Sequence, residues 1–192
     1  MCGRYTITTP TAELASYFGV LPPTEAYLAS ADARPSQNLP LVLDNEPTQM
    51  VVGHWGYRIK IKGKEKELIN VRAENILQKP YWRRIAKQHR CIILADGFYE
   101  WTKDSAHQKF RFTLQAGPMA FAGIYAWEQK KMSDEIRPFF SIITVAANKE
   151  MKPIHDRMPA ILDQKTAKQW IGEGEPLELL QPFARRMTID AL

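Results

Sequence analysis

Short runs of β-branched and aromatic residues recur through most of the chain, and they constrain its fold more strongly than any other feature. Runs of this composition, ended by turn-forming residues, are typical of strands. They predict strands at residues 2–8, 41–43, 49–57, 91–101, 110–115, 120–127 and 139–146. Helical patterns are fewer, with one between Pro10 and Gly19 and others at residues 80–88, 166–171 and 176–183. The pattern predicts an α+β fold built on a mixed or antiparallel sheet.

The length of 192 residues is enough for one domain with its own hydrophobic core. Residues 32–40 and 60–66 lack apolar periodicity, so we expect exposed loops there. Because neither segment resembles a linker, the chain is interpreted as a single domain over residues 1–192.

The charge balance favours a polyanionic partner. Lys and Arg number 26 against 21 Asp and Glu, a net charge of +5, which is common for nucleic-acid-binding proteins and also for basic proteins that bind none. No segment approaches the roughly 18 apolar residues of a membrane span. The first twenty residues also lack the pattern of a secretory signal. We therefore expect a cytoplasmic or nuclear protein.

Two cysteines differ in their sequence surroundings. Cys91 lies in an apolar run and is interpreted as a small buried hydrophobe. Neither the cysteines nor the four histidines have the spacing of a metal site, so we expect no disulfide, metal or cofactor. Cys2 follows the initiator methionine, and removal of Met1 would leave a free amine beside the thiol. Such a pair can form a Schiff base with an aldehyde and then close a thiazolidine ring.

Two further segments contain candidate acids and bases. Glu100 stands between Tyr99 and Trp101 at the end of an apolar run, where desolvation would raise its pKa and suit it to proton transfer, although it could equally face solvent. His155 lies in the segment Pro-Ile-His-Asp-Arg-Met-Pro, interpreted as a loop held by two prolines. It could protonate the ring oxygen of an opening sugar, but an isolated loop histidine is usually only solvated.

Polar residues also alternate near position 70. On a strand, Asn70, Arg72 and Glu74 would share one face that could hold a phosphate and a sugar, or simply face solvent at a sheet edge. Trp55 lies among His54, Tyr57, Arg58 and Lys60, a mixture of aromatics and cations found where bases stack on rings. Core packing explains Trp55 nearly as well.

Six motifs occur in a characteristic order: MCGRY at 1–5, WGY at 55–57, INVRAE at 69–74, ADGFYEW at 95–101, TVAA at 144–147 and IHDRMP at 154–159. Together they resemble the SRAP (SOS-response-associated peptidase) family over roughly residues 2–162. The resemblance implies a barrel-like, mostly β fold with short flanking helices. It also implies self-removal of Met1 and a covalent thiazolidine, with lyase-type chemistry, between Cys2 and abasic sites in single-stranded DNA, which shields those sites during the damage response.

The resemblance also implies roles for single residues. Cys2 would be the nucleophile, Asn70 would hold the opened sugar, and Glu100 would serve crosslinking, its reversal and methionine removal. His155 would assist ring opening. Phosphate contacts would come from Arg4, Arg72 and Arg157. Apart from the resemblance, the aromatic and cationic neighbours of Trp55 make it a further candidate DNA-binding residue. We expect a monomer without metal or membrane association, near the nucleoid in a bacterium or in the nucleus of a eukaryote.

Two features depart from the family pattern. The family often has an Asn where this chain has Asp32, and an acid there would repel phosphate unless Arg34 offsets its charge. The chain also ends soon after residue 185, whereas the family usually has a longer tail.

Two other interpretations remain open at this stage. An amino-terminal-nucleophile amidohydrolase or glutamine amidotransferase can also begin Met-Cys-Gly and attack an amide with its thiolate. A non-covalent reader of single-stranded DNA would leave Cys2 without a role. Only the abasic-site interpretation predicts a covalent product limited to abasic DNA.

Overall fold

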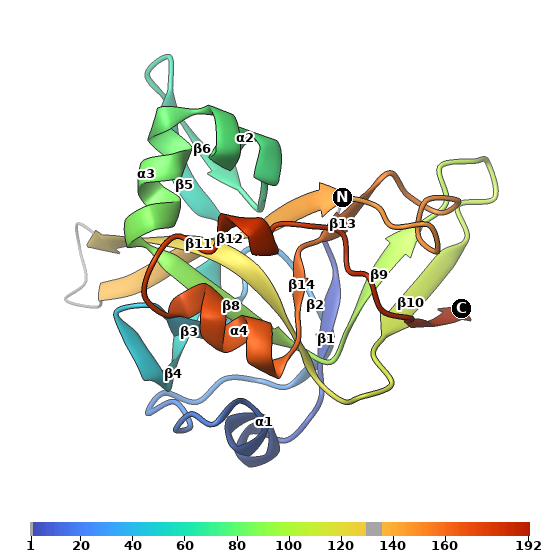
Figure 1. The fold of residues 1–192 in the computed structure, drawn as a ribbon, viewed down its shortest axis with the longest axis horizontal. Coiled ribbons are helices and arrows are strands. Elements are labelled where there is room, and N and C mark those ends of the chain that lie inside the picture. Colours follow the sequence, from blue (N-terminus) through green and yellow to red (C-terminus); the bar gives the residue numbers. More distant parts are fainter. Residues whose placement is uncertain (1, 130–135) are drawn as a thin grey trace.

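A five-stranded barrel forms the centre of the protein. The structure, a computed structural model, describes residues 2–129 and 136–192 (Figure 1). The barrel strands follow the order β12-β4-β3-β8-β11, and β11 pairs with β12 to close the ring. The β12–β4 pairing is parallel and the other four are antiparallel, which makes the barrel mixed. These strands are β3 (Asn38–Leu43), β4 (Glu46–Trp55), β8 (Arg90–Ala95), β11 (Met119–Gln129) and β12 (Ile136–Ala146).

A second sheet continues from the barrel. Asp96 alone separates β8 from β9 (Gly97–Trp101), so one segment passes from the barrel into a sheet of order β15-β10-β9-β1-β2. All pairings in it are antiparallel. Its other strands are β1 (Tyr5–Ile7), β2 (Ser30–Ala33), β10 (Lys109–Thr113) and β15 (Thr188–Ala191).

Shorter strands extend the edges of β12 and β11. On one edge of β12, β4 is followed by β7 (Asn70–Arg72), and both run parallel to it. On the other edge, β11 is followed by β13 (Arg157–Pro159). β14 (Ile161–Leu162) pairs with β11. Between β4 and β7 the chain forms a separate hairpin of β5 (Tyr57–Ile61) and β6 (Lys64–Leu68).

Four short helices flank the sheets in the described part of the chain, and the sequence explains their ends. α1 (Thr11–Phe18) ends at Gly19, which has φ of 69° as glycine allows. α3 (Pro80–Gln88) starts with Pro80 in the first turn and directly follows α2 (Ala73–Gln78). α4 (Gln164–Ile171) starts at Asp163 with a capping box to Thr166. Apolar faces including Phe18, Trp82 and Trp170 are buried.

Aromatic packing fixes the start of the chain against the barrel. Tyr5 is fully buried, and its ring centroid lies 5.2 Å from that of Trp55 and 5.7 Å from that of Phe121. Trp55 also stacks on Phe140 and donates its indole N–H to the carbonyl of Ile69 at 2.9 Å. These contacts hold β1, and with it the residues that precede it, in one position.

The α+β class and the main strands are confirmed, and several local predictions are wrong. Residues 60–66 do not form a loop but make up most of the hairpin. The hairpin is stabilised by cross-strand pairing and by a Lys62-Gly63 turn, and neither requires apolar periodicity in the sequence. Residues 32–40 include parts of β2 and β3, which leaves only a short turn between them.

Three further boundaries differ from prediction. Glu74 does not share a strand face with Asn70, because α2 begins at Ala73. The first strand starts at Tyr5 rather than Cys2, where pairing with β2 and β9 begins. In the segment 176–183, helical structure is limited to a 3₁₀ turn (Leu177–Leu179), bounded by Pro176 and followed by Pro182.

Candidate functional site

The carboxyl-terminal half of β12 brings two distant segments to one place. Ile142 and Thr144 pair with Asn70 and Arg72 of β7 on one edge. On the other edge, Ala146 pairs with Arg157 of β13. The backbone N–H of Ala147 donates to the carbonyl of Asp156 at 3.0 Å, which carries the pairing back toward His155. The segments around residues 70 and 155 therefore flank the same short stretch of strand.

Cys2 reaches this place because β1 pairs with β9. Tyr5 lies opposite Phe98, and the N–H of Tyr99 donates to the carbonyl of Arg4 at 2.9 Å. The chain before β1 therefore runs back along β9 toward Glu100. From the other side, Nδ2 of Asn70 donates to the carbonyl of Cys2 at 2.8 Å. Cys2 is thus positioned between β9 and β7.

Burial and mutual charge set the protonation of Cys2 and Glu100. Cys2 is fully buried and Glu100 is 4% exposed. Burial and the nearby Glu100 charge raise the pKa of the Cys2 thiol. Burial also raises the pKa of the Glu100 carboxyl. The thiol is therefore protonated at neutral pH, and any attack by its sulfur requires a neighbouring proton acceptor.

His155 has a fixed ring orientation. Its Nδ1 lies 2.9 Å from the backbone nitrogen of Arg157 and 3.0 Å from the carbonyl oxygen of the same residue, so the backbone of Arg157 can bond the neutral ring in either tautomer. Burial lowers the pKa of His155, which favours that neutral form. Bonding through Nδ1 fixes the ring orientation and leaves Nε2 on the side of the ring away from these two contacts.

Asp32 is neutralised by two arginines. Nη2 of Arg4 donates to Asp32 Oδ2 at 2.5 Å, and Nη2 of Arg34 donates to the same oxygen at 2.6 Å. Hydrogen bonding from Arg4 is the main cause that lowers the pKa of Asp32. The group of three keeps one net positive charge, so Arg4 as well as Arg34 offsets the acid. Arg4 also lies over the ring of Trp101, 5.7 Å from its centroid.

The other two predicted arginines differ in their surroundings. The Arg157 guanidinium makes two hydrogen bonds to the Glu74 carboxylate and one to the Thr144 carbonyl at 2.6 Å, and its side chain is 13% exposed. Arg72 is exposed, and no ion pair engages it within residues 2–129 and 136–192. Arg157 therefore ties α2 to β12, whereas Arg72 is open to a ligand.

Trp55 does not have the position that the sequence predicts. It is fully buried between Tyr5 and Phe140, so it presents no ring face to a base. A tryptophan that alternates with cations in sequence has packed inward because its strand turns that side to the core.

Two residues of the site region escape the sequence analysis. Asp96 accepts hydrogen bonds from the backbone N–H groups of Thr8 and Thr9, at 2.5 and 2.8 Å, and from the Thr6 hydroxyl. Burial opposes its charge, but these hydrogen bonds outweigh burial and lower the pKa of Asp96. Lys103 forms an ion pair with Asp156 and contributes positive charge near Glu100 and His155. The ADG sequence at residues 95–97 is a signal that could have identified Asp96, whereas no local sequence signal identifies Lys103.

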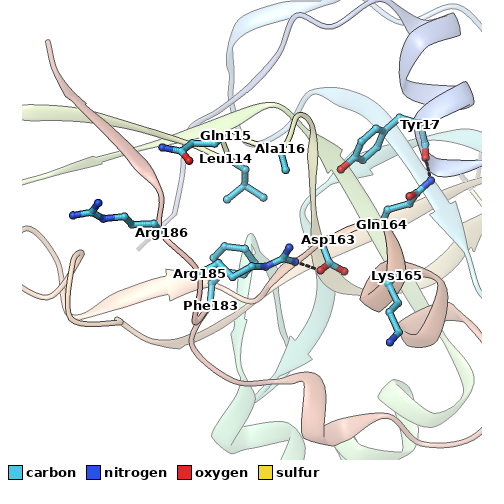
Figure 2. Close-up of a pocket in the computed structure, with 10 residues that line it drawn as sticks. All are labelled: Tyr17, Leu114, Gln115, Ala116, Asp163, Gln164, Lys165, Phe183, Arg185 and Arg186. Carbon is cyan, nitrogen blue, oxygen red and sulfur yellow. Dashed lines mark hydrogen bonds and ion pairs between the residues drawn. The ribbon is translucent and has the colours of Figure 1, made fainter.

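A surface pocket of about 400 Å³ lies elsewhere (Figure 2). It is lined by apolar side chains of Tyr17, Leu114 and Phe183 and by polar groups near the start of α4. Asp163 is already engaged there by Arg185 and by its capping interaction with Thr166. Because Cys2, Asn70, Glu100 and His155 do not line it, this pocket is separate from the site.

The described residues contain neither a cluster suited to a metal ion nor a helix suited to a membrane. No group of three or more His, Cys, Asp or Glu residues there could hold a metal ion. None of the helices in that part of the chain is long and apolar enough to cross a membrane.

Fold and site together define a class of protein: a small mixed β-barrel whose second residue is a cysteine beside a buried glutamate and an asparagine. A histidine also lies near the amino terminus. The chain belongs to the SOS response associated peptidase (SRAP) family, whose model matches residues 1–191. The resemblance predicted from the motifs is confirmed.

Relatives of known name and solved structures agree with this assignment. Abasic site processing protein YoqW of Bacillus subtilis is 35% identical over 200 residues, with 95% of this chain and 88% of that protein covered. Abasic site processing protein YoaM of the same organism is 36% identical over 183 residues, covering 90% and 79%. A crystal structure of a Bordetella bronchiseptica protein, 21% identical, shares the fold with a TM-score of 0.79 over 100% of this chain and 99% of that one.

Proposed function

We propose that the protein processes abasic sites in DNA, and that it captures them covalently through Cys2 after Met1 is removed. The observation that carries this proposal is the position of Cys2, buried between Asn70 and the raised-pKa carboxyl of Glu100. The names of relatives that are more than a third identical over most of this chain support the substrate.

Removal of Met1 is a hydrolysis that the protein performs on itself. One water is consumed, the Met1–Cys2 peptide bond breaks, and methionine leaves as the free acid while the Cys2 nitrogen becomes an amine. Glu100 is the residue suited to moving the protons, because its carboxyl is close enough to raise the pKa of the Cys2 thiol and has a raised pKa itself.

Capture of the aldehyde then follows in two bond-forming steps. The Cys2 amine condenses with C1′ of the opened sugar, releasing one water and giving an imine. The Cys2 sulfur adds to the imine carbon and its proton goes to the nitrogen, which closes a five-membered thiazolidine ring. No oxidant or metal is needed for either step, since every proton and electron pair is supplied by the reacting groups.

His155 and Asn70 have complementary roles in holding the sugar. In the tautomer in which Nδ1 accepts from the N–H of Arg157, His155 carries its proton on Nε2 and can give it to the ring oxygen as the sugar opens. Oδ1 of Asn70 is buried and has no hydrogen-bond partner among the described residues, although Nδ2 is engaged by Cys2. A sugar hydroxyl that donates to Oδ1 would satisfy this acceptor.

Single-stranded DNA is the form of substrate that the proposal favours. An abasic aldehyde must approach a buried cysteine, and a strand without a partner can bend into a site that a duplex cannot enter without local opening. Arg72 is exposed beside Asn70 and can contact a flanking phosphate, as can the net positive charge of the Arg4, Asp32 and Arg34 group.

The test compares Cys2→Ala with wild type on abasic and intact single strands, resolved on a denaturing gel. Wild type should give a covalent band with abasic DNA only, and Cys2→Ala should give none while still binding DNA without a covalent bond. Cys91→Ala is the matched control, since Cys91 is also fully buried but lies in the barrel.

The same gel separates the competing functions. A robust covalent band from Cys2→Ala would overturn the thiazolidine assignment. No band from wild type, despite binding to both strands, would favour a non-covalent reader, whereas hydrolysis of amide substrates without DNA binding would favour an amidohydrolase.

A further inference from the structure

The β5–β6 hairpin separates its charged residues by face. Residues directly opposite each other in an antiparallel pair lie on the same face. Arg58 lies opposite Glu67 and Lys60 opposite Glu65, so each cation of this face has an acid across from it. The Arg58–Glu67 pair closes at 3.1 Å. We call these four residues the balanced face.

On the opposite side, the only charged residues are lysines. The pairs on this side are Tyr57 with Leu68, Ile59 with Lys66 and Ile61 with Lys64; we call it the lysine face, and it contains no acid. Lys64 and Lys66 are exposed, and neither takes part in an ion pair within the described part of the chain. The positive charge of the hairpin that no acid balances is therefore concentrated on the lysine face.

The lysine face is the one turned toward α3. The ring centroid of Tyr57 lies 5.8 Å from that of Trp82, and burial together with the nearby Tyr81 raises the pKa of the Tyr57 hydroxyl. Arg84, one turn further along α3, contributes its positive charge to the surroundings of Tyr57. Tyr81 itself is 47% exposed. An exposed aromatic ring on α3 thus lies near Tyr57 of the lysine face, with Arg84 in the same surroundings. Aromatic rings combined with cations are found where proteins bind nucleic acid strands.

The position of the hairpin relates this surface to the site. β4 pairs with one edge of β12 up to Trp55, and β7 pairs with the same edge from Asn70 onward. The hairpin is therefore inserted between the two strands on the edge of β12 where the site lies. Its turn has positive φ at Lys62 and Gly63, as a tight two-residue turn requires, and projects beyond α2 and α3 in Figure 1. Lys64 lies about 14 Å along the strand from Leu68, or roughly four base steps at 3.4 Å each.

We propose that the lysine face, with Tyr81 and Arg84, binds the backbone phosphates of the DNA segment that flanks the abasic nucleotide on one side. Lys64 and Lys66 supply point charges about 7 Å apart along the strand, and Tyr81 offers a ring on which a base can stack. The inference rests on the proposed function, because it places DNA at the Cys2 site. It adds a contact with the DNA on only one side of the abasic nucleotide, which we call a one-sided footprint and which the residues around Cys2 do not provide.

Binding of intact oligonucleotides tests this surface without any chemistry. The double variant Lys64→Gln/Lys66→Gln is compared with Lys60→Gln/Lys165→Gln, which removes the same charge from the balanced face and from α4. The lysine-face variant should bind DNA about tenfold more weakly at moderate salt. The slope of log affinity against log salt concentration should become about two units less steep, one for each lost phosphate contact. The control should keep the wild-type slope. Equal losses in both variants would overturn the proposal, since net charge alone would explain them.

Abasic oligonucleotides that extend on only one side of the lesion test the direction. Four substrates carry a 5′ or a 3′ flank, each single-stranded or paired with a complement. The double variant should bind weakly to substrates of one polarity and like wild type to the other. The single-stranded and paired arms show which form of the flank is bound. An equal loss for both polarities, or no loss for either, would contradict the one-sided footprint.

A third readout separates this inference from the function on which it rests. At saturating DNA, the double variant should crosslink abasic strands as completely as wild type, because Cys2 and Glu100 are unchanged. Wild type that never crosslinks would refute the proposed chemistry while leaving the binding comparison intact. Tyr81→Ala should weaken binding of a single-stranded flank without altering the salt slope, and a matching thermal unfolding curve excludes misfolding.

Discussion

Glu100 is the single residue whose protonation most directly controls the site. Burial raises the pKa of its carboxyl, and its charge contributes to the raised pKa of the Cys2 thiol. A negative charge on Glu100 thus holds the thiol proton in place, whereas proton transfer to Glu100 removes that obstacle. One carboxyl can therefore accept a proton in one direction of the reaction and return it in the other.

We expect Glu100→Gln to slow Met1 removal and crosslink turnover by roughly 10²- to 10⁴-fold, the usual cost of losing a general acid–base group. Noncovalent DNA binding should change little, since the side chain is buried. Retention of Met1 is followed by intact mass, and turnover by transfer of the protein from one abasic strand to a competitor.

Glu46→Gln is the matched control for this measurement, because Glu46 is exposed on β4 away from Cys2. If Glu100→Gln kept wild-type rates in both assays while remaining folded, Glu100 would be structural. His155 would then be the first candidate for the proton transfers.

The chemistry-bearing residues could be predicted from sequence to different degrees. Cys2 is marked by its place after Met1, and Glu100 by the apolar residues around it. Trp55 could not be assigned from its neighbours, because only the register of β4 decides which side of a strand enters the core. Asp96 was missed because its partners Thr6, Thr8 and Thr9 are 87 to 90 positions away in sequence.

At the scale of elements, β12 is the strand that assembles the site. β7 and β13 lie on its two edges, and each contributes an arginine for which the sequence predicts a phosphate contact. The structure distinguishes the two, since Arg157 is bonded to Glu74 and Thr144 whereas Arg72 is exposed.

Arg72→Ala should weaken binding to intact and abasic strands alike and lower the salt slope by about one unit, as expected for one lost phosphate contact. Arg157→Ala should weaken binding by a different route, because it leaves the Glu74 carboxylate without its partner. Adding Glu74→Ala to Arg157→Ala should then restore much of the affinity. Anisotropy titrations over a range of salt check both results, and an unchanged slope in Arg72→Ala would remove Arg72 from the phosphate contacts.

Arg90 at the start of β8 joins the ends of two helices to the barrel. Its guanidinium donates to the carbonyls of Ala86 and Lys87 at the end of α3, and to those of Trp170 and Gly172 at the end of α4, at 2.7 to 3.0 Å. It is 4% exposed and lies 3.9 Å from Asp44. One side chain therefore satisfies carbonyls that both helices leave unpaired.

Arg90→Met should lower the free energy of unfolding by about 3–5 kcal/mol, because four helix carbonyls lose their hydrogen bonds and Asp44 loses the positive charge beside it. Arg90→Lys should recover only part of this, since an ammonium cannot reach all four carbonyls in a planar fork. Urea unfolding gives the values, with exposed Arg83→Met as the control. A loss below about 1 kcal/mol for Arg90→Met would mean that water replaces these hydrogen bonds.

Strands and helices could be predicted where the local pattern determines them. Pro80 and Gly19 fix helix ends, and α3 has the bounds that the sequence indicates. The hairpin could not be recognised, because Lys60 and Glu65 form a pattern only when the two strands face each other. β13, β14 and β15 are too short to give a local signal, and the partner strand alone defines them.

For the whole molecule, carboxyl groups fall into two classes with opposite effects on stability. Hydrogen bonds from arginines lower the pKa of Asp32 and Glu74, and hydrogen bonds from Thr6, Thr8 and Thr9 outweigh burial to lower that of Asp96. Groups of this class stabilise the fold above their unfolded pKa of about 4, and this contribution is lost as the pH falls through their folded pKa. Solvent screening reduces the effect of the exposed Glu74.

Glu100 belongs to the other class. Because burial raises its pKa, the folded state prefers the protonated carboxyl. Its contribution to stability is complete below its unfolded pKa and is lost as the pH rises through the folded pKa. At neutral pH the protein therefore retains a buried acid whose ionisation opposes folding, as is common for groups at active sites and as the role proposed for Glu100 requires.

We expect Glu100→Gln to be more stable than the parent protein at pH 7, by about 0.5–2 kcal/mol, and equally stable near pH 4, because an amide has no ionisation to suppress. Below pH 4 both proteins should lose stability together, since Asp32, Glu74 and Asp96 are unchanged. The two chains are compared in a Cys2→Ala background, with intact mass confirming that their amino termini match, and unfolding free energies are measured in urea from pH 3 to 8. A Gln variant that is less stable than its parent at pH 7 would show that the ionised carboxylate of Glu100 stabilises the fold. The raised pKa of Glu100 would then not correspond to a loss of stability that the proposed reaction requires.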